Sequence, residues 1–368
     1  MKLLFVAPEI CTPYTEGRKR FVLDLIDTLK KKDQVFLLTT TQVGQETTFS
    51  IPFKSALCQH GVQHLAYLIW NLFKVIREFN PDVVCVFPYG TFRGMYWYAS
   101  TWFMRIIDFI CQQNRVVCLT IMYSIDESTT AQDLQKKVSN LAISQQQDWT
   151  GDVVNVGLRY KHWRFNQTKN TKEPVLLFMA GMWQQTCSRV EHVINVRGLG
   201  VLLKVGEYLS KKGVKLIVAA PLFANEQCRN YLLSHPLNSW PESSITLLSE
   251  VSIPDVYSMA DVFVFPYQKE ITQFIPSSVI ESMLASTCVA MSDLNFLKPL
   301  AQNGNTAYLF PIEDTNKMSE ILLEALFNEK DRQNKVINAR KYVESNWTIN
   351  ISVEQIRQFV NQSQSNLF

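Results

Sequence analysis

The sequence QFIPSSVIESMLA, residues 273–285, is expected to join a strand to a helix, and it places a carboxylate, Glu281, at a fixed distance from the helix start. The segment before it, residues 261–266 (DVFVFP), is rich in β-branched and aromatic residues, as strands are. Ser277 or Ser278 is expected to cap the following helix by accepting hydrogen bonds from its first free amides. Because a helix start of this kind attracts phosphate, the stretch predicts an anion-binding turn.

Outward from this stretch, strand-like and helical segments alternate through the first half of the chain. Strands are expected over residues 3–7, 34–39, 82–87 and 115–121, and helices over residues 17–31, 64–79 and 95–112. This alternation predicts a parallel sheet with helices on both faces.

The pattern restarts after a polar segment at residues 163–173, which predicts a linker. Strands are expected over residues 214–220, 245–248 and 261–266, and helices over residues 199–211, 254–260 and 351–360. We therefore predict Rossmann-like domains at residues 1–165 and 166–346, with the tail 347–368 packing back on the first domain. Ligands of open α/β sheets bind at the carboxyl ends of strands, so the cleft between the domains is the expected site.

The composition excludes some functions. A chain of 368 residues with 47% hydrophobic residues can form two packed cores. Its net charge of +3 is too small to indicate a nucleic-acid partner, but it accommodates small anionic ligands. Eight cysteines without a C-x-x-C pair predict reduced thiols in a cytoplasmic protein, with no disulfide framework and no zinc site.

Contact with membranes is predicted to be peripheral at most. The apolar run at residues 3–7 is too short for a signal peptide, and no apolar segment is long enough to span a bilayer. The aromatic segment 95–104 favours a core helix, with an acceptor pocket or a lipid surface as alternatives. The basic runs 18–20 and 30–32 can attract anionic lipid, although such runs are usually solvated faces.

Several segments of the second half follow one another in a characteristic order. They are residues 252–267, 280–285, 289–293 and 303–310, followed by Trp347. Together they resemble glycosyltransferases of the GT-B fold, and they are most similar to the large retaining family 4, the glycosyl transferases group 1. The resemblance implies an α/β protein with two Rossmann-like domains and a cleft between them. It also implies transfer of a sugar from a nucleotide-diphosphate sugar, of UDP or GDP type. No metal-ligand cluster is visible in the sequence, so no metal and no other cofactor are expected.

The resemblance assigns roles to individual residues. The family pairs two glutamates eight positions apart; the second, which binds the donor ribose, corresponds to Glu281, and the first, near the transferred sugar, is replaced by Gln273. The family binds the diphosphate through an arginine after one glycine and a lysine before another. Here Gly181 is followed by Met182 instead of arginine, and Arg197 takes the lysine position. Arginine can grip a diphosphate through two hydrogen bonds at once.

Further donor contacts are expected around these residues. The nucleotide is expected to lie against the segment from Ile245 to Val251. The diphosphate is expected near the amides of Ser277 and Ser278. In the long connection after Gly181, Arg189 or His192 is a candidate replacement for the missing arginine.

The first domain departs from the family pattern at two places. The family's first loop has two glycines that let the backbone approach the donor phosphate and the acceptor. This chain keeps one of them, Gly17, with Glu16 beside it, and a plain strand-to-helix turn is the alternative. Met122 follows a strand where the family often has a histidine.

We therefore predict a retaining, metal-independent glycosyltransferase, of hexosyltransferase type, with a glycan, a lipid-linked molecule or a small molecule as acceptor. The departures leave open a catalytically impaired homologue that binds or stabilises a partner. A transferase or epimerase of another GT-B family is a more remote alternative.

Overall fold

The structure of the protein is a computed structural model. It describes residues 1–7, 17–39, 48–50, 62–87, 95–122, 140–143, 152–155, 157–159, 173–181, 185–250, 252–269 and 276–365. The chain forms two compact units. The first combines residues 1–159 with the chain from Trp347 onward, and the second takes most of residues 160–346. The predicted junction between residues 165 and 166 lies outside the described residues.

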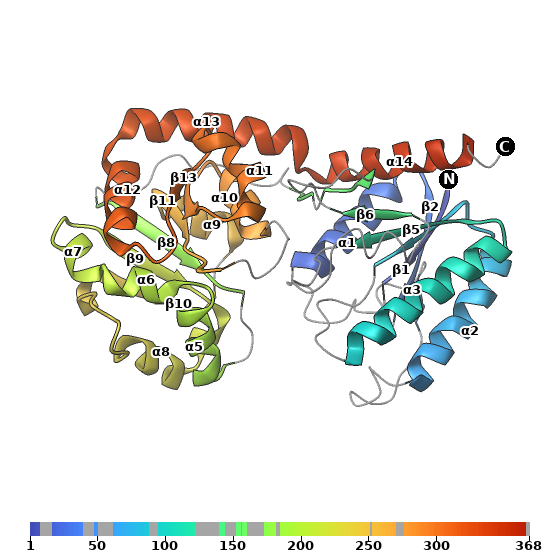
Figure 1. Cartoon of the computed structure of the whole chain (residues 1–368), viewed down its shortest axis with the longest axis horizontal. Helices are drawn as coiled ribbons and strands as arrows, with labels where there is room; N and C mark the ends of the chain where they lie inside the picture. Colours follow the sequence, from blue (N-terminus) through green and yellow to red (C-terminus); the bar gives the residue numbers. More distant parts are fainter. Residues whose placement is uncertain are drawn as a thin grey trace. The chain divides into compact units, whose positions relative to one another are not determined.

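The first unit contains, in its described part, a seven-stranded parallel sheet in the order β3-β2-β1-β4-β5-β6-β7 (Figure 1). The strands are β1 (Lys2–Val6), β2 (Gln34–Thr39), β3 (Thr48–Ser50), β4 (Val83–Val86), β5 (Val117–Met122), β6 (Leu141–Ile143) and β7 (Asp152–Val153). The helices are α1 (Gly17–Leu29), α2 (Val62–Phe79), α3 (Met95–Gln113) and α14 (Ile349–Ser365).

The central strand β1 shows why this sheet has helices on both faces. Leu3 and Phe5 point into a core shared with α1 and α14, whereas Leu4 and Val6 point into a second core shared with α2 and α3. Successive side chains of a strand alternate between faces, so a run of apolar residues needs cover on both. All four side chains are fully buried.

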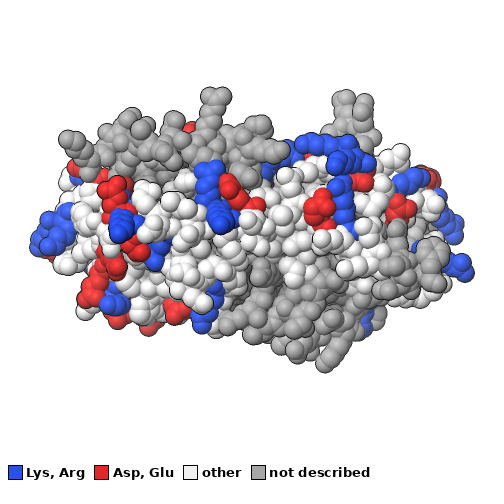
Figure 2. Space-filling model, turned by 90° about the horizontal axis from the view of Figure 1, so that it is seen from above, with Lys and Arg blue, Asp and Glu red and all other residues white. Residues whose placement is uncertain are grey.

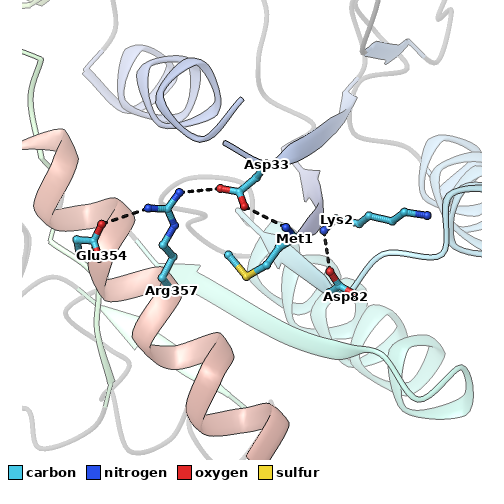
Figure 3. A network of polar contacts seen from close by, with 6 residues as sticks. All are labelled: Met1, Lys2, Asp33, Asp82, Glu354 and Arg357. Carbon is cyan, nitrogen blue, oxygen red and sulfur yellow. Dashed lines mark hydrogen bonds and ion pairs between the residues drawn. The ribbon is translucent and has the colours of Figure 1, made fainter. Parts of the chain in front are cut away.

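The helix α14 is fixed to the first unit by apolar packing and by a polar network (Figure 3). Ile356 and Phe359 enter the core beside α1. The guanidinium of Arg357 donates to Asp33 Oδ2 at 2.8 Å, and the amino group of Met1 donates to Asp33 Oδ1 at 3.1 Å. Burial alone would raise the pKa of Asp33, but these two donors outweigh it and hold that pKa below its ordinary value.

The second unit contains, in its described part, a six-stranded parallel sheet in the order β10-β9-β8-β11-β12-β13. The strands are β8 (Val175–Met179), β9 (Lys215–Ala219), β10 (Ile245–Leu248), β11 (Val262–Phe265), β12 (Cys288–Ser292) and β13 (Tyr308–Phe310). The α-helices are α5 (Cys187–Asn195), α6 (Leu199–Lys204), α7 (Gly206–Ser210), α8 (Glu226–Leu233), α9 (Ile253–Ser258), α10 (Ser277–Leu284), α11 (Lys298–Ala301), α12 (Thr315–Phe327) and α13 (Glu329–Asn346). Short 3-10 helices lie at Pro221–Ala224, Glu242–Ser244, Asn295–Leu297 and Gln302–Gly304.

Two features of this unit differ from the sequence prediction. The helix expected over residues 199–211 is broken between α6 and α7 at Val205. Gly206, directly after the break, packs so closely on Trp240 that an added Cβ would lie 2.3 Å from the indole ring. The long connection after Gly181, for which no helix was predicted, contains the helix α5.

The observed architecture confirms the predicted fold class, α/β with two Rossmann-like units. Within the described ranges, no helix is both long enough and apolar enough to cross a bilayer. The six described cysteines are all free thiols, and five of them are buried. Cys11 and Cys58 lie outside the described residues.

Candidate functional site

The turn from β11 to α10 is built differently from the prediction at its helix start. Pro276 occupies the N-cap position of α10 with φ −69° and ψ 130°, and this cap makes no side-chain hydrogen bond. The fixed φ of proline sets the extended backbone that precedes a helix. Capping by the side chains of Ser277 or Ser278 is therefore a wrong prediction, because both residues lie in the first turn. What the first turn can offer an anion is its backbone amides.

The carboxylate of Glu281 lies on the second turn of α10 and is 9% exposed. The hydroxyl of Tyr257 shares its one hydrogen between two acceptors, the carbonyl oxygen of Ser278 at 2.9 Å and Glu281 Oε2 at 3.2 Å. Burial raises the pKa of Tyr257 well above its ordinary value, and the nearby Glu281 charge adds to the shift. Tyr257 therefore stays protonated and holds one carboxylate oxygen in place.

Tyr257 is itself fixed by neighbouring elements. Its ring is fully buried and meets Phe263 of β11 edge to face, with centroids 5.7 Å apart. The hydroxyl of Thr287, just after α10, donates to the backbone oxygen of Tyr257 at 3.0 Å. The carboxylate of Glu281 thus rests on contacts from α9, β11 and α10 together, a level of support that precise ligand positioning requires.

Arg197 lies in a turn that docks on the carboxyl end of β11. Gly198 has φ +78°, and an added Cβ there would lie 1.6 Å from the carbonyl oxygen of Pro266, so only glycine fits this approach. The Arg197 guanidinium carbon lies 5.8 Å from the ring centre of Tyr267. That ring stacks on Phe265 at 4.0 Å between centroids.

The Tyr267 ring supports the Arg197 side chain electrostatically and sterically. Burial raises the pKa of Tyr267, while the positive charge of Arg197 acts in the opposite direction. A guanidinium over an aromatic face is attracted to the ring quadrupole. Both residues predicted to bind the nucleotide-sugar donor are therefore supported by β11. Glu281 is held by Tyr257, which packs on Phe263 of this strand. Arg197 lies over Tyr267, just after the strand ends.

The remaining predicted residues are distributed as follows. Gln273, Val251, Met182 and Glu16 lie outside the described residues. Gly181 is exposed directly after β8, where an added Cβ would meet nothing within 4 Å. Gly17 begins α1 and Met122 ends β5, both in the first unit. Arg189 and His192 lie on α5, and the backbone oxygen of His192 accepts from the amide of Arg197 at 3.3 Å.

Two site residues, Tyr257 and Tyr267, were not predicted from the sequence. Each sits in the segment 252–267 that carries the family resemblance, one on either side of the strand 262–265. Their positions beside this strand are visible in the sequence, but their contacts with Glu281 and Arg197 are not. Within the part of the chain that the structure describes, no cluster of three or more His, Cys, Asp or Glu side chains is arranged to hold a metal ion.

Comparison with known proteins identifies the type of domain. Residues 185–328, less than half of the chain, match the family model described as glycosyl transferases group 1. This match includes Arg197, Tyr257 and Glu281. No curated protein matches the chain.

Solved structures resemble the chain over nearly its whole length. A glycosyltransferase from Rickettsia africae has a TM-score of 0.70 at 11% identity, with 98% of this chain and 97% of that chain covered. Sucrose-phosphate synthase from Thermosynechococcus elongatus has a TM-score of 0.70 at 13% identity, with 99% of each chain covered. The Anabaena protein HepE, solved with UDP-glucose, has a TM-score of 0.66 at 13% identity, with 98% and 100% covered. These likenesses and the family match confirm the predicted resemblance to GT-B glycosyltransferases of group 1.

Proposed function

We propose that this protein transfers a sugar from a nucleotide-diphosphate sugar, of UDP or GDP type, to an acceptor. The observation that carries the proposal is the buried carboxylate of Glu281, which Tyr257 holds at 3.2 Å on the helix that follows β11. A carboxylate can accept hydrogen bonds from two neighbouring ribose hydroxyls, which suits it to bind the donor nucleotide. The UDP-glucose bound to HepE, a protein of the same fold, supports this ligand class.

In this proposal the second unit holds the donor. Arg197 binds the diphosphate together with the first-turn amides at Ser277 and Ser278, and Gly181 lets the backbone approach it. The nucleotide lies along the chain that ends at Val251. The guanidinium of Arg197 and the backbone amides stabilise the negative charge that develops on the leaving oxygen, and this is the main help to departure of the nucleoside diphosphate. No step requires a metal ion.

Gln273 is proposed to face the transferred sugar. An amide donates and accepts hydrogen bonds with sugar hydroxyls, but it lacks the negative charge that a glutamate would bring. We propose retention at the anomeric carbon and a hexose as the transferred group, both from the group 1 resemblance. Gly17, at the start of α1 in the first unit, is proposed to line the acceptor side, and the acceptor is a glycan, a lipid-linked molecule or a small molecule.

The experiment that tests activity is donor turnover. The full chain is incubated with UDP- and GDP-hexoses, with and without acceptor extracts, and release of the nucleoside diphosphate is followed. We expect slow hydrolysis of one donor without acceptor, faster release with acceptor, and no loss of rate when metal is chelated. Proton NMR of the product reports the anomeric configuration. Release that needs an added divalent metal would contradict the metal-independent proposal.

The second candidate function is a non-catalytic subunit of the same fold. The departures at Gln273, Met182, Glu16 and Met122 favour it, because a charged residue, a glycine or a histidine is absent at each position. This alternative predicts donor binding, or binding to a partner transferase, without turnover of any donor. Restoring the family residue with Gln273→Glu separates the two: turnover gained only in that variant indicates an impaired enzyme.

A further inference from the structure

Large apolar side chains are exposed on two neighbouring helices of the first unit. Trp70 and Phe73 on α2 are 73% and 37% exposed, and Phe109 on α3 is 58% exposed. The helices lie side by side on one face of the sheet (Figure 1), and their opposite sides are buried in the core through residues such as Leu72 and Ile110. The three exposed side chains therefore lie on the outward sides of the helices.

Basic side chains occupy the same outward sides. Lys74 and Arg77 follow Trp70 by four and seven residues, and Arg105 precedes Phe109 by four, spacings that place them on one side of each helix. All three are exposed. We define the aromatic–basic face by these six residues: Trp70, Phe73, Lys74, Arg77, Arg105 and Phe109. Among the described side chains of α2 and α3, the exposed carboxylate is Glu78, which lies 3.8 Å from Lys74.

We propose that the aromatic–basic face binds the surface of an anionic lipid bilayer. Helices that lie in a membrane interface combine tryptophan and phenylalanine with lysine and arginine. The aromatic rings enter the boundary between headgroups and acyl chains, and the long basic side chains reach lipid phosphates while their stems cover apolar surface. Each basic residue near an anionic surface strengthens binding about fivefold.

The charge of the face argues against a second copy of this chain as its occupant. In a symmetric dimer the same patch meets itself, so the three basic side chains of one copy would oppose those of the other. Opposed like charges are unfavourable across an interface. An anionic lipid surface, in contrast, complements both the charge and the aromatic side chains.

The experiment is co-flotation of the full chain with vesicles. We expect the wild type to float with vesicles of phosphatidylcholine plus phosphatidylglycerol, not with phosphatidylcholine alone, and to be released by salt. Arg77→Glu/Arg105→Glu should bind at least about 25-fold more weakly, since two contributions of about fivefold are lost. Trp70→Ala/Phe109→Ala should also weaken binding.

Matched controls come from the second unit. Phe327 is 58% exposed there, so Phe327→Ala should bind vesicles like the wild type. Lys212→Glu/Lys330→Glu, at two exposed basic residues, controls for the change in net charge. Thermal melting of every variant separates loss of binding from loss of folding. Nucleotide titration is measured separately, so failure of the proposed transferase function and failure of lipid binding are distinguishable.

Trp70 gives a second test that does not depend on affinity. Brominated lipids quench tryptophan fluorescence at the depth of the acyl chains, and we expect this quenching to fall in Trp70→Phe, which retains an aromatic ring. The proposal is overturned if the wild type does not float with anionic vesicles, or if the α2 and α3 variants float as it does. A concentration-dependent dimer that Trp70→Ala/Phe109→Ala abolishes, without vesicle binding, would also overturn it and identify a second copy as the occupant.

Discussion

The hydroxyl of Tyr257 lies 3.2 Å from Oε2 of Glu281 and 2.9 Å from the carbonyl oxygen of Ser278. One phenol thus links the proposed ribose-binding carboxylate to the first turn of the helix that carries it. Because Tyr257 is fully buried, a ligand is expected to contact Glu281 and not the phenol.

This relationship predicts the effect of Tyr257→Phe. The variant keeps the ring that packs on Phe263 but removes the hydroxyl that donates to Oε2 of Glu281. A hydrogen bond to a charged group contributes about 1.5–3 kcal/mol, of which we expect part to appear as roughly three- to tenfold weaker nucleotide binding. Preference for ribonucleotides over deoxyribonucleotides should shrink as well. A variant with merely loosened packing would lose affinity for both ligands equally, and that result would contradict the positioning role.

Comparison of two glycines tests how much the close packing of the turn after Arg197 contributes to stability and to nucleotide binding. Gly198 and Gly213 have almost the same backbone, with φ +78° and +79°, but an added Cβ at Gly213 meets nothing within 4 Å. Gly213→Ala should therefore cost only the strain of a left-handed alanine, about 1–2 kcal/mol. Gly198→Ala must also move the carbonyl of Pro266, so we expect a larger fall in melting temperature and a loss of nucleotide binding. Equal effects of the two substitutions would show that the close approach is unimportant.

The network around Asp33 predicts how stability depends on pH. Its pKa is lowered in the folded protein, because hydrogen bonds from Arg357 and the amino terminus outweigh the opposing effect of burial. The stabilisation is therefore present above the ordinary carboxyl pKa of about 4 and is lost as pH falls through the lower, folded-state pKa.

Asp33→Asn should accordingly lower the free energy of unfolding at neutral pH by about 1–3 kcal/mol and flatten its decline in acid. Urea unfolding at pH 7 and at acidic pH measures both. Glu329→Gln, at an exposed residue of the second unit, should change stability by less than about 0.5 kcal/mol. If Asp33→Asn and Arg357→Gln have fully additive effects, the ion pair is not a stabilising unit.

The buried thiols predict an order of alkylation. Burial raises the pKa of Cys85 and of Cys288 to about 12, so both are protonated and inaccessible in the folded protein. Cys187, at the start of α5, is partly exposed. With iodoacetamide at mild alkaline pH, mass spectrometry should find Cys187 modified first among the six described cysteines, and Cys85 and Cys288 only after denaturation. Rapid native labelling of Cys85 would contradict the observed core.

Much of the fold is predictable from the sequence, because strands and helices can be recognised from short segments of neighbouring residues. The apolar runs within residues 82–87 and 261–266 contain β4 and β11, in which every residue is buried, since strands buried on both faces leave continuous apolar segments. The break at Val205 is not predictable in this way. It depends on the contact between Gly206 and Trp240, two residues that are distant in the sequence.

The candidate site is only partly predictable, because it too depends on contacts between residues that are distant in the sequence. Glu281 is found from its position in a motif, but its partner Tyr257 is identified only when α9 and α10 are seen together. The predicted serine caps are wrong because Pro276, one residue earlier, already sets the helix start. The exposed faces of α2 and α3 depend on which side of each helix the sheet covers. Periodicity alone does not reveal a surface formed by two helices.

Binding of the donor by Glu281 is measured by calorimetric titration of UDP- and GDP-sugars into the wild type, Glu281→Ala and Glu329→Ala. We predict that one donor class binds the wild type and Glu329→Ala equally well. Glu281→Ala should bind at least about tenfold more weakly, since hydrogen bonds to a charged acceptor contribute about 1.5–3 kcal/mol. No binding of any donor to the wild type, or equal binding to Glu281→Ala, would show that Glu281 does not hold a nucleotide-sugar donor.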